Sequence, residues 1–208
     1  MKKHQLLNII FPNIALTIGI VLLILLSACN QTEKDCYENG QLKLSQQKKH
    51  GRCNGETVAY YENGNIHYQA TYVNDTLNGP YVRFFSNGHK EIESTYNMGR
   101  LQGEVLTYSP DGVLVMKEEY EAGVRNGDFL TYYPSGNEQI RGSYANGMID
   151  GHWLFFSEEG LLLGEADFQH GNGIQTIYNR NGAVERTVEY KDNEKIETSQ
   201  QTNRITAK

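Results

Sequence analysis

The chain has 208 residues, of which 38% are hydrophobic, 11% aromatic and 21% charged, a composition that is typical of a folded protein and excludes collagen and generic disorder. Its formal net charge of −6 provides no basic surface for a phosphate backbone, so we expect no nucleic-acid partner. Glycine (21 residues) and tyrosine (14 residues) are frequent, which indicates many turns between short strands that carry aromatic side chains.

The first 28 residues have the layout of a secretory signal. A basic start at Met1–His4 precedes the uncharged apolar stretch Ile14–Leu26. A retained transmembrane helix is the alternative, because Ile9–Ala28 has about the 20 residues that a bilayer requires. We favour a helical signal segment that is cleaved, because of the residues at its end.

The tetrapeptide Leu26–Cys29 resembles the bacterial lipobox, a small-residue cleavage site followed by the cysteine that receives a diacylglycerol. The resemblance implies that residues 1–28 are removed and that Cys29 is the lipid attachment site of a membrane-anchored lipoprotein. Asn30 differs from the aspartate that resembles an inner-membrane retention signal, which favours the outer membrane of the cell envelope. Residues 29–35 are then a polar tether.

With Cys29 lipidated, two cysteines remain, Cys36 and Cys53, in a compartment where disulfides persist. We predict that these two cysteines form a disulfide. Closing a loop of about 17 residues would stabilise the fold by roughly 3 kcal/mol.

Two glycine series give the rest of the chain a repeat. Glycines recur every 24 residues from Gly40 to Gly160, and a parallel series recurs every 24 residues from Gly55 to Gly151. Each series ends with one step of 22 residues, the second of them at Gly173. A fixed period of this kind indicates an array whose units stack on their neighbours.

Each unit is predicted to be one β-hairpin. Runs rich in aromatic and β-branched residues, such as 79–85, are separated by Asn-Gly, Asp-Gly, Ser-Gly or Glu-Gly, which is a strong hairpin signal. Pro110 and Pro134 lie two residues before the turn glycine, where a type I′ turn does not accept proline. We therefore predict a three-residue loop, in which the glycine takes a positive φ in a G1 bulge.

Two aromatic columns predict the core. The first strands carry Tyr60, Phe84, Tyr108, Tyr132, Phe156 and Tyr178, and the return strands carry Tyr72, Tyr96, Tyr120, Tyr144, Phe168 and Tyr190. We expect both columns on one core face, with the residues two positions earlier, such as Val58 and Ala70. Alternate residues of the return strands, such as Gln69 and Glu93, are expected to face water. Glu118 is the one charged residue on the expected core face.

A lone unit buries too little to offset the entropy of ordering it, so the stability must come from stacking. We expect an all-β, elongated array of stacked antiparallel hairpins over residues 36–190, with about twelve strands and a length near 60 Å. Residues 36–54 are expected to form a truncated first unit that caps the array. Residues 191–208 are expected to form a polar C-terminal tail.

The unit with an opening glycine, a tyrosine pair, a turn glycine, a return tyrosine and a closing Asn-Gly is clearest in Gly127–Asn146. It is similar to the MORN repeat in its bacterial variant form, and the likeness covers residues 36–190. Bacterial proteins of this kind are often grouped as YwqK-type antitoxins, and eukaryotic MORN arrays are linked to membranes and protein scaffolding. The resemblance therefore implies partner binding. The 22-residue unit at Gly173, with Gln175 and Thr176 in place of apolar residues, departs from the pattern.

The sequence contains no recognisable catalytic, cofactor-binding or metal-binding motif. The histidines lie in different columns without ligand spacing, and the paired glutamates at 118–119 and 158–159 point to opposite faces of a strand. We therefore expect neither an enzyme nor a cofactor. An aromatic stripe on the other parity of the first strands includes Tyr81, Phe129 and Trp153, and we interpret it as structural rather than as a glycan or protein site.

Two functional hypotheses follow. The first is a non-catalytic, lipid-anchored scaffold in the cell envelope that offers its sheet to a protein or cell-wall partner. The alternative, which the family resemblance suggests, is an antitoxin or immunity protein that binds a toxin. A toxin that acts in the envelope would reconcile the two.

Overall fold

The computed structural model describes residues 30–196, which form one sheet of sixteen strands. The strands are β1 (Gln31–Cys36), β2 (Leu42–Lys49), β3 (Arg52–Tyr60), β4 (Ile66–Val73), β5 (Thr76–Phe84), β6 (Lys90–Asn97), β7 (Arg100–Leu101), β8 (Gly103–Tyr108), β9 (Leu114–Glu121), β10 (Val124–Tyr132), β11 (Glu138–Ala145), β12 (Met148–Phe156), β13 (Leu162–Gln169), β14 (Asn172–Tyr178), β15 (Val184–Lys191) and β16 (Glu194–Ile196).

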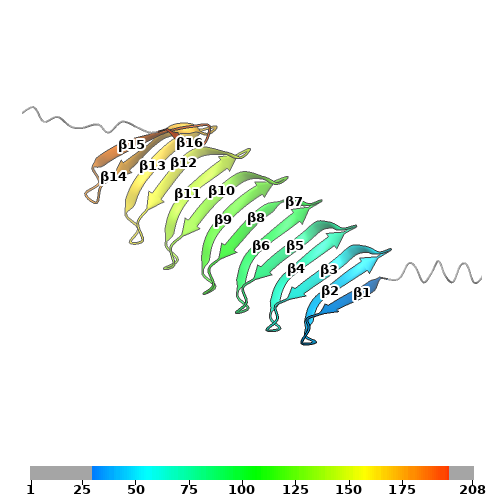
Figure 1. Cartoon of the computed structure of the whole chain (residues 1–208). Coiled ribbons are helices and arrows are strands. Elements are labelled where there is room, and N and C mark those ends of the chain that lie inside the picture. The colour runs from blue at the N-terminus through cyan, green and yellow to red at the C-terminus, as the bar shows by residue number, and fades with distance from the viewer. Residues whose placement is uncertain (1–29, 197–208) are drawn as a thin grey trace, which may run out of the picture.

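The strands follow one another across the sheet in chain order, and every neighbouring pair is antiparallel (Figure 1). The short β7 pairs with β6 beside the start of β8. This arrangement confirms the expected all-β array of stacked hairpins. Within residues 30–196 there is no helix of the length and apolarity that a membrane span requires. The signal segment 1–28 and Cys29 lie outside the described residues.

The loops inside the hairpins have the predicted geometry. In the hairpin of β3 and β4, Gly64 N donates to Tyr61 O at 2.9 Å and Tyr61 N donates to Asn65 O at 2.8 Å. Gly64 has a φ of 87°. This is a type I turn followed by a left-handed glycine, and a side chain at that φ would be strained. The three-residue loop with its glycine bulge is therefore confirmed.

Tight two-residue turns join one hairpin to the next. Asn146 and Gly147 both have positive φ (51° and 82°), as a type I′ turn requires. Gly147 N donates to Arg125 O at 2.8 Å, in the unit before. Equivalent bonds run from Gly123 to Leu101 and from Gly171 to Ile149. These bonds tie each turn to its neighbour along one edge of the array.

The final step of 22 residues has a specific structural cause. At the junction of β4 and β5, Ala70 lies opposite Tyr81 and Tyr72 lies opposite Leu77, so β5 carries two extra residues in a bulge. At the junction of β13 and β14, Ala166 lies opposite Gln175 and Phe168 lies opposite Gly173, without extra residues. The two missing residues are therefore those of the bulge, and the stacking of the last hairpin continues.

Both ends of the array differ from the expectation. Residues 31–36 form β1 rather than a tether, so the first unit is a complete hairpin with β2 and not a truncated one. Residues 194–196 form β16 on β15 rather than part of a free tail. The sequence pattern missed both strands because their side chains are polar and exposed, whereas their pairing is made by the backbone.

The strand register corrects the expected core face. Thr57 lies opposite Ala70, and Val58 lies opposite Gln69. Directly opposed residues of an antiparallel pair share a face, so Val58 and the column of Tyr60 lie with Gln69, on the side opposite Ala70 and the column of Tyr72. We expected the even-numbered residues of both strands on one face. The pairing instead places the even-numbered residues of β3 on the face opposite those of β4.

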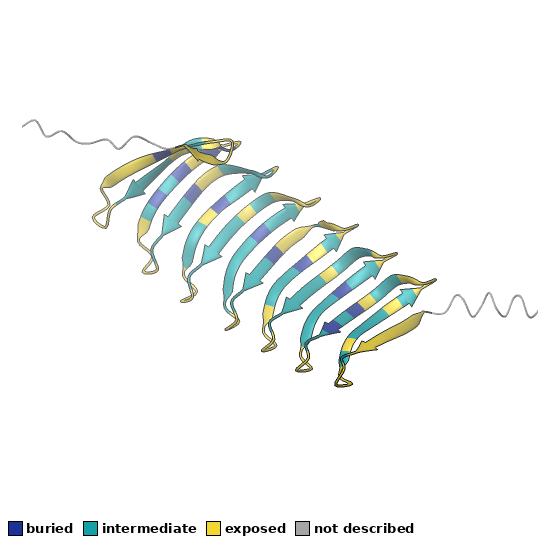
Figure 2. Cartoon of the chain, in the orientation of Figure 1, coloured by how far each residue is buried: buried dark blue, intermediate teal, exposed yellow. Residues whose placement is uncertain are grey.

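We call the side of Ala70 the aromatic face. It carries Thr57, Tyr81, Val105, Phe129 and Trp153 of the first strands together with Ala70, Ser94, Glu118, Gly142 and Ala166 of the return strands and the column of Tyr72. We call the opposite side, which carries Val58, Gln69 and the column of Tyr60, the mixed face. Figure 2 shows the buried positions near the middle of the strands, and those of the aromatic face include Trp153 (5% exposed) and Ala166 (2% exposed).

Candidate interaction surface

The aromatic face of β4 to β6 carries a row of half-buried rings. The Tyr68 and Tyr81 rings are stacked with centroids 6.1 Å apart, and the Tyr96 ring meets that of Tyr81 edge-on at 5.9 Å. Such offset and edge-on pairs add to the stability of the burial itself. Burial raises the pKa of the Tyr72 and Tyr81 hydroxyls above its usual value. All four rings, those of Tyr68, Tyr72, Tyr81 and Tyr96, are half-buried.

The aromatic face of β10 to β15 carries a denser cluster around Trp153. The Trp153 ring lies 5.4 Å from the rings of both Phe129 and Tyr144 and 6.2 Å from that of Phe168, which in turn meets Tyr190 at 5.3 Å. Trp153 is therefore a core residue, as the structural interpretation of the aromatic stripe proposed. The stripe belongs to the buried side of the sheet, however, and not to the side expected to face water.

Gly142 makes room for the Trp153 ring. A Cβ atom at this glycine would lie only 2.1 Å from Cδ2 of Trp153. The same position holds Ala70, Ser94 and Ala166 in other hairpins, so small residues alternate with rings across the face. This part of the sequence interpretation, that small side chains make room for rings, is confirmed for the return strands.

An ion pair separates the two aromatic regions. Glu118, only 5% exposed, accepts a hydrogen bond of 2.7 Å from Arg125 Nε, and the Arg125 guanidinium lies 5.3 Å from the centre of the Tyr144 ring. Burial opposes the charge of Arg125, but the Glu118 carboxylate and the hydroxyls of Tyr120 and Tyr144 together outweigh it and hold the pKa of Arg125 above its usual value. A glutamate in a column of small residues was the one signal of this ion pair in the sequence, and nothing there indicated its partner.

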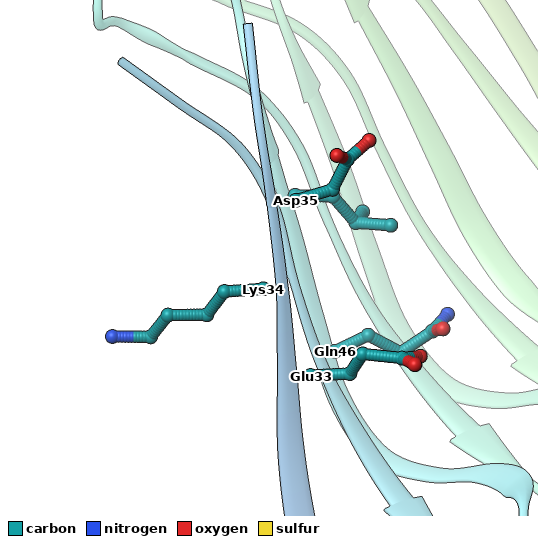
Figure 3. A pocket seen from close by; sticks show the side chains of 5 residues that line it. Glu33, Lys34, Asp35 and Gln46 are labelled. Atoms are coloured by element: carbon teal, nitrogen blue, oxygen red, sulfur yellow. The ribbon is translucent and has the colours of Figure 1, made fainter. Parts of the chain in front are cut away.

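The first hairpin replaces rings with charges. Glu33 and Asp35 occupy the aromatic face of β1, and they line a shallow hollow with Leu44 and Gln46 of β2. Figure 3 shows Lys34, the fifth lining residue, pointing to the other side of the strand. Lys48 pairs with Glu33, and Lys43 lies 3.7 Å from Asp35. All six residues of β1 are exposed.

The expected disulfide is not formed. Cys36 lies opposite Leu42 at the loop end of β2, whereas Cys53 lies opposite Lys48 at the other end. Six residues of extended strand separate the two positions by about 20 Å, far beyond the reach of a disulfide. Both thiols are free in the structure. The prediction was wrong because it placed Cys36 in a cap and ignored the length of β2.

The described part of the sheet carries no metal-binding cluster of side chains. In residues 30–196, no three histidine, cysteine or acidic side chains are placed to hold a metal ion. Glu118 is buried on the aromatic face, whereas Glu119 lies opposite Glu104 on the mixed face, so the two neighbouring carboxylates point apart. The described residues therefore present two faces and two edges of a single long sheet for binding.

Comparison with protein families identifies three of the units. Residues 54–74, 101–122 and 172–192 match the MORN repeat variant. They include the hairpin β3–β4, the hairpin β8–β9 with the preceding β7, and the hairpin β14–β15. No curated protein matches the chain. In these three units the repeat array is therefore similar to the MORN repeat variant.

Proposed function

We propose that the chain is a non-catalytic scaffold that binds a protein partner through its repeat sheet. MORN repeats are generally protein- or membrane-binding modules, which supports a role of this kind. The observation that carries the proposal is the single sheet, whose tyrosine rings on β4 to β6 contact one another and stay half-buried. A surface of half-buried aromatic rings is typical of recognition sites.

We further propose that Cys29 anchors this scaffold in the cell envelope, at the outer membrane. The support is the signal layout of residues 1–28 and the resemblance of Leu26–Cys29 to a lipobox. Mass spectrometry of the mature N-terminus tests the anchor. We expect a diacylglycerol on Cys29, and Cys29→Ser is expected to release the protein from the membrane fraction. An unmodified Cys29 in the mature chain would refute this part of the proposal.

Site-specific photo-cross-linking in cells tests partner binding. A photoreactive amino acid at Tyr96, on the aromatic face, is expected to cross-link one protein reproducibly, and the matched control replaces Glu56 on the mixed face. Identical products from both positions, or none from either, would contradict the proposal. The identity of the captured protein also tests the alternative hypothesis, since a toxin encoded beside this gene would indicate an antitoxin role.

A further inference from the structure

The two edges of the sheet are finished differently. At the C-terminal edge, Asn193 of the β15–β16 turn accepts a hydrogen bond of 2.8 Å from Ile149 N and donates one of 3.0 Å to Gly147 O. This turn therefore closes back over the start of β12. At the N-terminal edge, β1 pairs with β2 on one side and has no strand on its other side within residues 30–196.

The open edge has the geometry of the internal junctions. At each of those junctions, the first strand of one hairpin pairs antiparallel with the return strand of the hairpin before it. β1 is the first strand of its hairpin and is the one that lacks such a neighbour in the described chain. An extended segment is therefore able to add to β1 with the pairing that the array already uses.

The charges of β1 select the chemistry of that segment. Glu33 and Asp35 lie on the aromatic face with exposed side chains (64% and 63%), and the hollow beside them is open. Asp35 holds Lys43 only loosely, at 3.7 Å. Both carboxylates have free surface for a second cation. A cross-strand residue of opposite charge stabilises such a pair, and a like charge destabilises it.

The same charges disfavour a second copy of this chain. A two-fold axis through the sheet at Lys34 would place Glu33 of one copy opposite Asp35 of the other, and an axis at Glu33 would place the two Glu33 side chains opposite each other. Carboxylates in that position repel one another, and charged residues on edge strands commonly prevent such self-pairing. The occupant is therefore a different chain.

We propose that the free edge of β1 binds an extended basic segment of a partner protein as an added antiparallel strand, with alternate lysines or arginines against Glu33 and Asp35. This inference rests on the proposed scaffold function and specifies where the partner docks and what its docking segment contains. β-strand addition of this kind takes its affinity from main-chain hydrogen bonds and its specificity from alternate side chains.

Peptide binding to the full chain in detergent tests the inference. The probe is a capped, fluorescent peptide of about ten residues with alternating lysine and threonine, and its control has glutamate in place of lysine. We expect the basic peptide to bind about tenfold more tightly than the acidic one, because the acidic peptide replaces the two favourable charge pairs with Glu33 and Asp35 by two repulsive ones. Amide hydrogen exchange is expected to slow in residues 31–36.

The matched variant is Glu33→Lys with Asp35→Lys, which is expected to reverse the peptide preference. The pairs with Lys48 and Lys43 that it removes are confined to the exposed first hairpin, so amide hydrogen exchange in β12 and β13 is expected to stay unchanged and serves as the folding control. Equal binding of both peptides, no binding of either, or protection outside β1 would overturn the inference. The photo-cross-linking at Tyr96 is independent of β1, so the scaffold proposal and this inference can fail separately.

Discussion

The two aromatic regions of the sheet use the same columns to different effect. Around Trp153, large rings fill the space over Gly142 and Ala166, and the cluster is buried. Around Tyr81, which lies opposite Ala70, the tyrosine rings form a row and stay half-exposed. In the first hairpin the same face carries Glu33 and Asp35. The comparison shows that one repeat geometry supports a gradient from a packed core to an open, polar edge.

The largest effect is expected at Trp153. Trp153→Ala removes the ring that joins Phe129, Tyr144 and Phe168, and we expect it to lower the free energy of unfolding by about 4 kcal/mol. Tyr81→Ala, at the equivalent position three hairpins earlier in the sheet, is expected to cost about 2 kcal/mol or less, because that ring is only half-buried. Urea unfolding measures both values. Equal losses would remove the distinction between the two regions.

Gly142 tests whether the room beneath the Trp153 ring matters. Gly142→Ala is expected to cost about 3 kcal/mol, because its Cβ would lie 2.1 Å from Trp153 Cδ2 and displace the ring. Ser94→Ala, at the equivalent position beside Tyr81, is the control and is expected to change stability little. The near-ultraviolet circular dichroism of the tryptophan reports whether the ring has moved. An unperturbed ring in Gly142→Ala would refute the packing account.

The ion pair between the two regions is expected to have the next largest effect. Arg125→Ala leaves the buried Glu118 carboxylate without its cation, which we expect to cost about 2 kcal/mol. Adding Glu118→Ala restores the small residue of the other hairpins and is expected to recover most of that loss. A double variant less stable than Arg125→Ala alone would show that Glu118 stabilises the sheet by some other contact.

A smaller effect is expected at high pH on the mixed face. Burial, together with the hydrogen bond from the Tyr108 hydroxyl to Glu93, raises the pKa of Tyr108 to about 12. Because the folded chain holds this proton more tightly than the unfolded chain, its contribution to stability is complete below pH 10 and is lost as the pH rises toward 12. Tyr108→Phe is expected to reduce the fall in stability across this range. An unchanged slope would contradict the assignment.

No stability effect is expected from reducing agents. Both cysteines are predicted to react with an alkylating reagent in the folded protein, Cys36 faster, since burial and Asp75 raise the pKa of the Cys53 thiol. The thermal midpoint is expected to be the same with and without a reductant. A mass spectrum showing a Cys36–Cys53 disulfide would require a different register for β2.

The sequence was sufficient for the features that repeat. The period of the glycines predicted the hairpins, and Pro110 and Pro134 predicted the three-residue loop, because only one turn geometry accommodates them. The alternation of small residues and rings on the return strands also followed from the columns.

Features that depend on pairing between strands were not predictable in this way. The side of the sheet on which Tyr60 lies depends on the register between β3 and β4. A shift of one residue in that register would move Tyr60 to the same face as Tyr72. β1 and β16 escaped prediction because main-chain pairing needs no apolar pattern. The partner of Glu118 escaped it because Arg125 approaches from the next hairpin.

Amide hydrogen exchange of the full chain tests the central claim, that stability follows ring packing on the aromatic face. We expect the slowest exchange in β12 and β13, beside Trp153, intermediate exchange in β4 to β6, and the fastest in β1. Uniform protection along the array, or slower exchange in β1 and β2 than in β12 and β13, would contradict the account.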